Sequence, residues 1–171
     1  MPEVSRAHST SRPIGRGGRG EPSQLNPNYV VGFVDGEGCF SVNLCKHNTL
    51  KRRVEIRAQF EIELRIDDKK ILERIQAALG CGKIYELDYP RYRQWQPHAK
   101  YKVSNIKDLK EKIVPFFERH PLQAKKAESF KLFSQIVGLI ATKQHLTDRG
   151  YKKALKIRER AKKIGKKARN R

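Results

Sequence analysis

The chain has 171 residues and a mass of 19.8 kDa, with 38 lysines and arginines against 18 acidic residues and a formal net charge of +20. This length suits one compact domain and is too short for two full enzyme domains. No apolar run approaches the roughly 20 residues that span a bilayer, so we expect no integral membrane segment and no membrane partner. The three cysteines lack the spacing of a zinc site or a disulfide framework, and we interpret them as packing residues. A charge this positive predicts a polyanionic partner, and nucleic acid is the first candidate.

The positive charge is unevenly distributed along the chain. Residues 1–22 are rich in Arg, Ser and Gly, carry a net charge of +2 and lack apolar periodicity, so we expect a disordered arm. Residues 23–150 carry +8 and have the pattern of a folded domain, whereas 151–171 carry +10 and predict a basic C-terminal helix and tail. Because the central domain is basic in its own right, we expect it to contact the polyanion directly.

The first predicted element is a short apolar helix that starts at Asn26-Pro27 and ends at Gly36 and Gly38. Asn is a strong N-cap, and Pro has the backbone angle required at the first helical position. Two strands follow, at about 40–45 and at 53–65, in which apolar and polar residues alternate without a break. That alternation is typical of a sheet with one buried and one exposed face.

A second helix begins at Asp67 or Asp68 and ends at Gly80, a residue type that favours the helix C-terminus. The remaining predicted elements are a strand pair at 82–87 and 99–104 around a polar loop at 88–98, helices over 104–117 and 122–142, and a basic helix that begins near Leu146-Thr147. This order predicts an α+β domain in which a four-stranded antiparallel sheet carries helices on one face only. The other face is left for a ligand.

The segment Val30-Val31-Gly32-Phe33-Val34-Asp35-Gly36-Glu37-Gly38 carries the most chemical information. Gly32 and Gly36 lie four residues apart on one helix face, where missing side chains allow another helix to approach. Asp35 and Glu37 lie at the helix C-terminus, where the macrodipole is already negative, so a cation is needed to neutralise them. Oxygen ligands of this kind suit Mg²⁺, which keeps several waters and is often shared with phosphate.

This segment resembles, position by position, the nine-residue motif of the LAGLIDADG homing endonucleases. The similarity covers about residues 25–160 and includes the Asp67-Asp68 helix, Gly80-Cys81-Gly82-Lys83-Ile84, Pro115-Phe116-Phe117 and Leu122-x-x-Lys125-Lys126. The resemblance implies an α-ββ-α-ββ-α saddle that lies in the major groove of double-stranded DNA. It also implies Mg²⁺-dependent cleavage of that DNA, with Mn²⁺ or Ca²⁺ able to replace Mg²⁺ in binding.

The resemblance assigns roles to five residues. Glu37 corresponds to the metal-binding acid, although the usual residue is Asp, and the carbonyl of Gly36 lies beside it in the family. Asp35 corresponds to an earlier acid that orients the helix end. Lys125 or Lys126 corresponds to a catalytic lysine that supports the scissile phosphate or the attacking water, and the sequence does not decide between the two. As a structural alternative, both acids could simply end an ordinary helix.

A single motif implies a homodimer. The segment 136–141 echoes the motif but has Ala141 where an acid would be needed, so we interpret it as the core face of a helix. Cleavage of two strands requires two symmetric carboxylates, which a two-fold dimer provides. We therefore expect the first helices of two subunits to pack together through Val31, Gly32 and Asp35.

The outward residues of the predicted strands, with two arginines of the loop, are the candidate DNA contacts. Arg and Lys suit guanine, Gln suits adenine and Glu suits cytosine, while the tail and the loop are expected to contact phosphates. A solvent-exposed sheet surface is the alternative interpretation. Glu63 and Arg65, near the end of the second strand, are candidates for the polar pocket residue that the family often adds. The predicted contacts are Ser41, Asn43, Arg53, Glu55, Arg57, Gln59, Glu61, Lys83, Arg91, Arg93, Lys100 and Lys102.

The leading hypothesis is thus a homodimeric, Mg²⁺-dependent DNA endonuclease of the homing type. The rival hypothesis is an intron RNA-splicing maturase or a DNA-binding protein on the same scaffold without cleavage activity, and the basic tail keeps intron RNA open as a partner. The retained acid at position 37 favours cleavage. The compartment, either an organelle or a bacterial or archaeal cytoplasm, and the target site stay undetermined.

Overall fold

The structure, a computed structural model, describes residues 25–89 and 96–169, with side chains described as far as residue 165. The arm predicted at 1–22 and the loop residues Arg91 and Arg93 lie outside the described residues. Among the described helices, none has both the length and the apolar character needed to cross a membrane.

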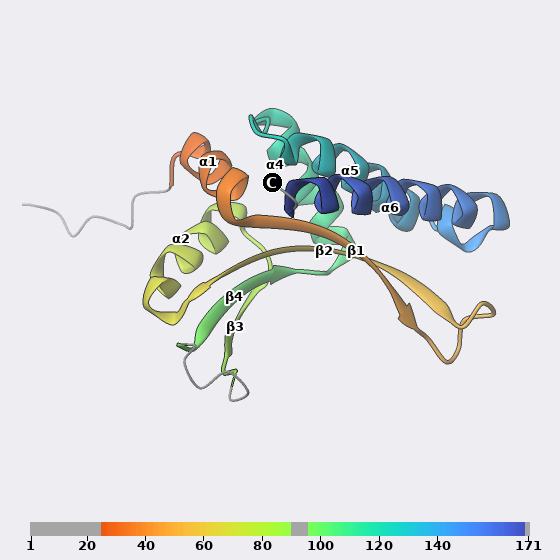
Figure 1. Cartoon of the computed structure of the whole chain (residues 1–171), viewed down its shortest axis with the longest axis horizontal. Coiled ribbons are helices and arrows are strands. Elements are labelled where there is room, and N and C mark those ends of the chain that lie inside the picture. Colours follow the sequence, from red (N-terminus) through yellow and green to blue (C-terminus); the bar gives the residue numbers. More distant parts are fainter. Residues whose placement is uncertain (1–24, 90–95, 170–171) are drawn as a thin grey trace, which may run out of the picture.

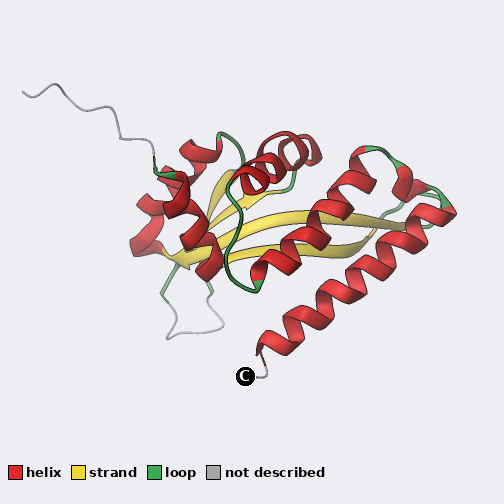
Figure 2. Cartoon of the chain, turned by 90° about the horizontal axis from the view of Figure 1, so that it is seen from above, coloured by secondary structure: helices red, strands yellow, loops and turns green. Residues whose placement is uncertain are grey.

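Four antiparallel strands form one sheet in the order β1-β2-β4-β3. The strands are β1 (Gly38–Lys46), β2 (Val54–Arg65), β3 (Lys83–Leu87) and β4 (His98–Val103), and the helices are α1 (Pro27–Glu37), α2 (Lys69–Leu79), α3 (Ile106–Asp108), α4 (Val114–Arg119), α5 (Lys126–Ala141) and α6 (Asp148–Arg169). The helices lie on one side of a curved sheet, and its concave side is left open (Figures 1 and 2). The predicted α+β fold, α-ββ-α-ββ-α with helices on one face, is confirmed.

The alternation in β2 separates core from surface as predicted. Ile56, Ala58, Phe60 and Ile62 are each at most 4% exposed and face the helices, so the odd-numbered residues between them face the concave side. Phe60 lies opposite Phe40 of β1, and their ring centroids are 5.0 Å apart. Aromatic packing of this kind adds to the free energy gained from burial and fixes the sheet beneath the helix layer.

Two predicted boundaries are wrong, and each has a local reason. Arg53 is not part of the second strand; it lies in the turn before β2 with φ of +50°, and its carbonyl accepts the N–H of His47. The helix predicted from 122 begins at Lys126 instead, because the preceding connection docks on α1 through Gln123. The third predicted helix is a helical stretch from α3 to α4 that includes a π-helical turn just before Pro115, which has no N–H to donate.

The basic C-terminal segment is a helix that packs into the domain. Thr147 caps α6 by accepting the N–H of Gly150 at 3.1 Å, as predicted. Ala154 is fully buried and Ile157 is 5% exposed, and α6 lies along α5 and past the edge of β1 (Figure 2). Arg158 ties it to that edge, since its Nε donates to the carbonyl of Val42 at 3.1 Å. Removing residues 151–171 would therefore remove part of the core as well as charge.

Candidate active site and nucleic-acid interface

The motif forms a direct junction between α1 and β1, without an intervening loop. The N–H of Gly38 bonds back to the carbonyl of Val34. A Cβ atom at position 38 would lie 2.6 Å from Val34 Cγ1 and 2.9 Å from the Val34 oxygen, so no other residue fits this junction without a shift. The tight junction holds Glu37, the last residue of α1, directly before the first residue of β1.

The two acids of the motif have different surroundings at the end of α1. Asp35 Oδ2 accepts the backbone N–H of Gln123 at 2.8 Å, whereas its Oδ1 is buried and lacks a hydrogen bond among the described residues. Glu37 is exposed and is the last residue of the helix. Both carboxylates lie at the negative end of the helix dipole, where an anion is disfavoured and a cation is favoured.

Lys126 brings positive charge to this helix end. Its Nζ donates to the carbonyl of Val34 at 2.8 Å and to that of Gly36 at 3.2 Å. Burial lowers the pKa of Lys126 below the ordinary lysine value, and the nearby Cys39, Asp35 and Glu37 only partly offset that effect. The exposed Lys125 occupies the N-cap position of α5, but its side chain makes no capping hydrogen bond there. Of the two candidate lysines, Lys126 is the one that contacts the motif.

The donor atoms at the end of α1 suit a divalent cation of the Mg²⁺ type. They are the exposed Glu37 carboxylate and the Gly36 carbonyl. Within the described parts of the chain no group of three or more His, Cys, Asp or Glu side chains gathers into a closed cage. A cation bound by so few protein oxygens would have to complete its coordination with water or phosphate oxygens, as Mg²⁺ commonly does. The ammonium of Lys126 already contacts the Gly36 carbonyl, at 3.2 Å.

A groove of about 810 Å³ extends from this site between β1 and α6. It is lined by Asp35, Cys39, Ser41, Asn43, Lys126, Arg158 and Lys162, among others. The exposed Cys39 contradicts its interpretation as a packing residue. The sequence-based prediction did not include the residues of α6 that line this groove. The apolar spacing of Ala154, Ile157, Ala161 and Ile164 could have predicted them, because this spacing defines a buried helix face with Arg158 and Lys162 beside it.

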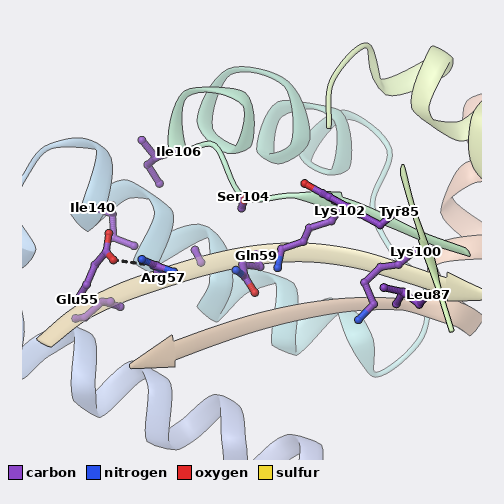
Figure 3. Close-up of a pocket in the computed structure, with 12 residues that line it drawn as sticks. Glu55, Arg57, Gln59, Tyr85, Leu87, Lys100, Lys102, Ser104, Ile106 and Ile140 are labelled. Carbon is purple, nitrogen blue, oxygen red and sulfur yellow. Dashed lines mark hydrogen bonds and ion pairs between the residues drawn. The ribbon is translucent and has the colours of Figure 1, made fainter. Parts of the chain in front are cut away.

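The strand residues predicted to contact DNA share the concave face. The register pairs Ser41 with Gln59 and Asn43 with Arg57, while Lys102 lies between Glu61 and Lys83. Part of this face is a hollow of about 690 Å³ whose lining includes Glu55, Arg57, Gln59, Lys100 and Lys102 (Figure 3). Arg53 is in the turn beyond the strand, so it does not take part in this array.

Three basic residues of the concave face are held by carboxylates. Arg57 pairs with Glu55 at 2.6 Å, Lys102 with Glu61 at 3.2 Å and Lys100 with Glu63 at 2.8 Å.

Glu63 also accepts the hydroxyl of Tyr89 at 2.7 Å and lies 3.4 Å from His98 Nδ1. Burial works to raise its pKa, but the hydrogen bonds of Lys100 and Tyr89 and the charges of Lys100 and His98 outweigh it and lower the pKa. This acid is therefore held as a carboxylate.

One face of α1 carries no covering element among the described residues. Tyr29 is 48% exposed and stacks on Phe33 at 6.1 Å, and a Cβ at Gly32 or Gly36 would meet no atom within 4 Å. Val31 does not belong to this face, since it is 6% exposed and packs into the core. Of the three predicted interface residues only Gly32 lies there, because Asp35 is directed to the connection before α5.

Comparisons with known proteins give one family. The sequence model of the LAGLIDADG endonuclease family matches residues 30–137. The probable intron-encoded endonuclease 2 of Neurospora crassa is 32% identical over 135 residues, which are 78% of this chain and 28% of that protein. An uncharacterized protein from an ND4 intron of Podospora anserina is 35% identical over 127 residues, or 73% of this chain and 26% of that one. The chain thus spans about a quarter of the length of these two relatives.

Two solved structures show the same architecture. The homing endonuclease I-TnaI has a TM-score of 0.71 and 32% identity, with 84% of this chain and 98% of that chain covered. I-SmaMI bound to an uncleaved DNA target with calcium ions has a TM-score of 0.72 and 30% identity, with 78% of this chain and 44% of that chain covered. The chain therefore belongs to the LAGLIDADG endonuclease family.

Proposed function

We propose that this chain is one subunit of a homodimeric, Mg²⁺-dependent endonuclease that binds double-stranded DNA on its concave face. The observation that carries the proposal is the junction at Gly38. It joins an acidic helix end, contacted by the lysine Lys126, directly to a sheet face lined with Arg, Lys, Gln and Glu. Among the relatives, I-SmaMI is bound to DNA, which supports DNA as the partner.

The homodimer is supported by the open face of α1. The open positions at Gly32 and Gly36 would let the α1 helices of two copies approach closely around a two-fold axis. Each copy would then contribute one Glu37.

The chemistry would be divided among the residues at the end of α1. Glu37 and the Gly36 carbonyl would hold Mg²⁺, which when bound polarises phosphodiester oxygens and makes a bound water more acidic. Lys126 would stabilise the negative charge that develops on the phosphate. Asp35 would position Lys126, because it holds the connection that leads into α5.

The test is cleavage of a duplex library that includes the junction of the two exons flanking the chain's own coding intron. With Mg²⁺ we expect the wild type to cut both strands, and Glu37→Gln to lose at least about 10²-fold in rate while its binding in Ca²⁺ is retained. Glu37→Asp keeps the carboxylate and should keep measurable activity. Glu118→Gln, an exposed acid on α4, removes the same charge away from the site and serves as the control.

Full cleavage by Glu37→Gln would overturn the assignment of the metal-binding acid. Tight binding by the wild type without cleavage of any duplex would instead favour a maturase or a DNA-binding protein.

A further inference from the structure

The middle of the concave face carries carboxylates, although carboxylates repel the phosphates of DNA. Glu61 and Glu63 project from β2, and each lies directly opposite a lysine of β4. The two ion pairs, Glu61 with Lys102 and Glu63 with Lys100, have Nζ to oxygen distances of 3.2 and 2.8 Å. Lys83 lies on the same face beside Lys102, and no ion pair holds it in the described part of the chain.

Stability does not account for this arrangement. The four side chains are between 21% and 32% exposed, and for such partly buried ions the cost of removing water offsets much of the energy gained by pairing. Carboxylates on a DNA-binding face also repel phosphates, which weakens binding to every sequence. A feature that weakens binding to DNA of every sequence and adds little stability is typical of a surface that discriminates between sequences.

Resting on the proposed DNA-binding function, we propose that Glu61 and Glu63 are specificity filters that hold Lys102 and Lys100 away from the phosphates of arbitrary DNA. The lysine of each Glu–Lys pair binds DNA with its full affinity only where one base pair can hydrogen bond to the lysine and to the glutamate together. In the major groove that base pair is G·C, because guanine O6 and N7 accept from lysine and cytosine N4 donates to glutamate.

The spacing of the pairs fits this match. Guanine O6 and cytosine N4 of one base pair are hydrogen bonded to each other, so they are separated by about 2.7–3.2 Å. The ammonium and carboxylate of each Glu–Lys pair have a similar separation. An A·T or T·A pair satisfies only part of the arrangement, and the phosphate backbone satisfies only the lysine.

The decisive measurement is the affinity for random-sequence duplex DNA, in Ca²⁺, as a function of salt concentration. Glu61→Gln and Glu63→Gln keep the side-chain size but free the lysine opposite. For each we expect about 3- to 10-fold tighter binding of random DNA and a salt slope steeper by about 0.9, the value for one more neutralised phosphate. In selection from a randomised duplex library, each variant should lose about 10-fold in preference for G·C at one position of each half-site.

Glu73→Gln is the matched control. It removes one negative charge from α2, on the helix side of the sheet, where Glu73 is an exposed partner of Lys69 at 3.7 Å. A further variant, Glu61→Gln with Lys102→Gln, restores the wild-type net charge. Its salt slope should return to the wild-type value, because the freed lysine is gone.

Two results separate the proposals. If Lys102→Gln alone leaves DNA binding unchanged, DNA does not contact this face, and the proposed function falls together with the filter. If Lys102→Gln weakens binding but Glu61→Gln and Glu63→Gln behave like Glu73→Gln, the filter alone is overturned.

Discussion

The end of α1 and the concave face of the sheet meet at Gly38 but use charge differently. At the helix end, Asp35 and Glu37 lie against an unfavourable dipole, and the lysine that contacts this end is partly buried with a lowered pKa. On the sheet, each acid faces a basic partner. Burial works to lower the pKa of Lys100, yet the hydrogen bond and charge of Glu63 and the charge of Glu61 raise it overall.

This difference predicts how each region responds to substitution. At the helix end the electrostatic cost is concentrated in a few residues, so a single change is expected to abolish function while folding is preserved. On the sheet the charges balance in pairs, so single changes should shift affinity and preference by small factors. The predictions below run from the largest expected effect to the smallest.

Gly32→Leu is expected to have the largest effect. A Cβ atom at this position has open space around it, and Gly32 lies on the exposed face of α1, so the monomer should fold normally. On the open face of α1 it would block the approach of a second subunit, and double-strand cleavage should fall below detection. Sedimentation should show a change from about 40 kDa to about 20 kDa, on the basis of the 19.8 kDa chain mass.

The control is Ala77→Leu, which adds a similar side chain to an exposed position of α2. A wild type that sediments as a 20 kDa monomer with and without DNA would contradict the dimer. So would a Gly32→Leu variant that cuts both strands at the wild-type rate.

Substitution of the two neighbouring lysines tests whether the helix end acts through contacts or through general charge. Lys126→Met removes the donor to the Val34 and Gly36 carbonyls and should reduce the cleavage rate about 10²-fold with binding largely kept. Lys125→Met removes an equal charge from an exposed position and should change the rate by less than about threefold. Equal losses in both variants would show that the region contributes charge alone.

Local patterns predicted the elements of both regions well. The alternation from 54 to 64 and the N-cap at Asn26 depend on neighbouring residues, so the sequence alone was sufficient to predict the sheet face and α1. The glycines at 36 and 38 placed Glu37 at the helix end for the same reason, whereas its metal-binding role was implied only by the family resemblance. Each of these features is determined by periodicity or by a cap.

Features that depend on tertiary contacts were not predictable. The choice between Lys125 and Lys126 depends on where α5 begins, and that is decided by the bond between Gln123 and Asp35, 88 positions apart. The inward direction of Val31 depends on which face of a nearly all-apolar helix meets the sheet. The pairing of Glu63 with Lys100 requires the register of β2 with β4, which no local signal specifies.

The smallest expected effect is the pH-dependent stability of Glu63→Gln. Because the pKa of Glu63 is lowered in the folded state, the unfolded state binds more protons near the ordinary glutamate value of about 4.3. The carboxylate therefore stabilises the fold above that pH, and this contribution is lost as the pH falls through the lowered folded value. Glu63→Gln should lower the melting temperature at pH 7 by no more than about 2–4 °C, as for a surface pair, and by nothing measurable well below pH 4.

Glu73→Gln serves again as the control for the loss of one exposed acid. A difference between Glu63→Gln and the wild type that stays the same across this pH range would mean that Glu63 stabilises the sheet by packing and not by its charge. Glu63 would then no longer support the conclusion that charges balance in pairs on the sheet but not at the helix end.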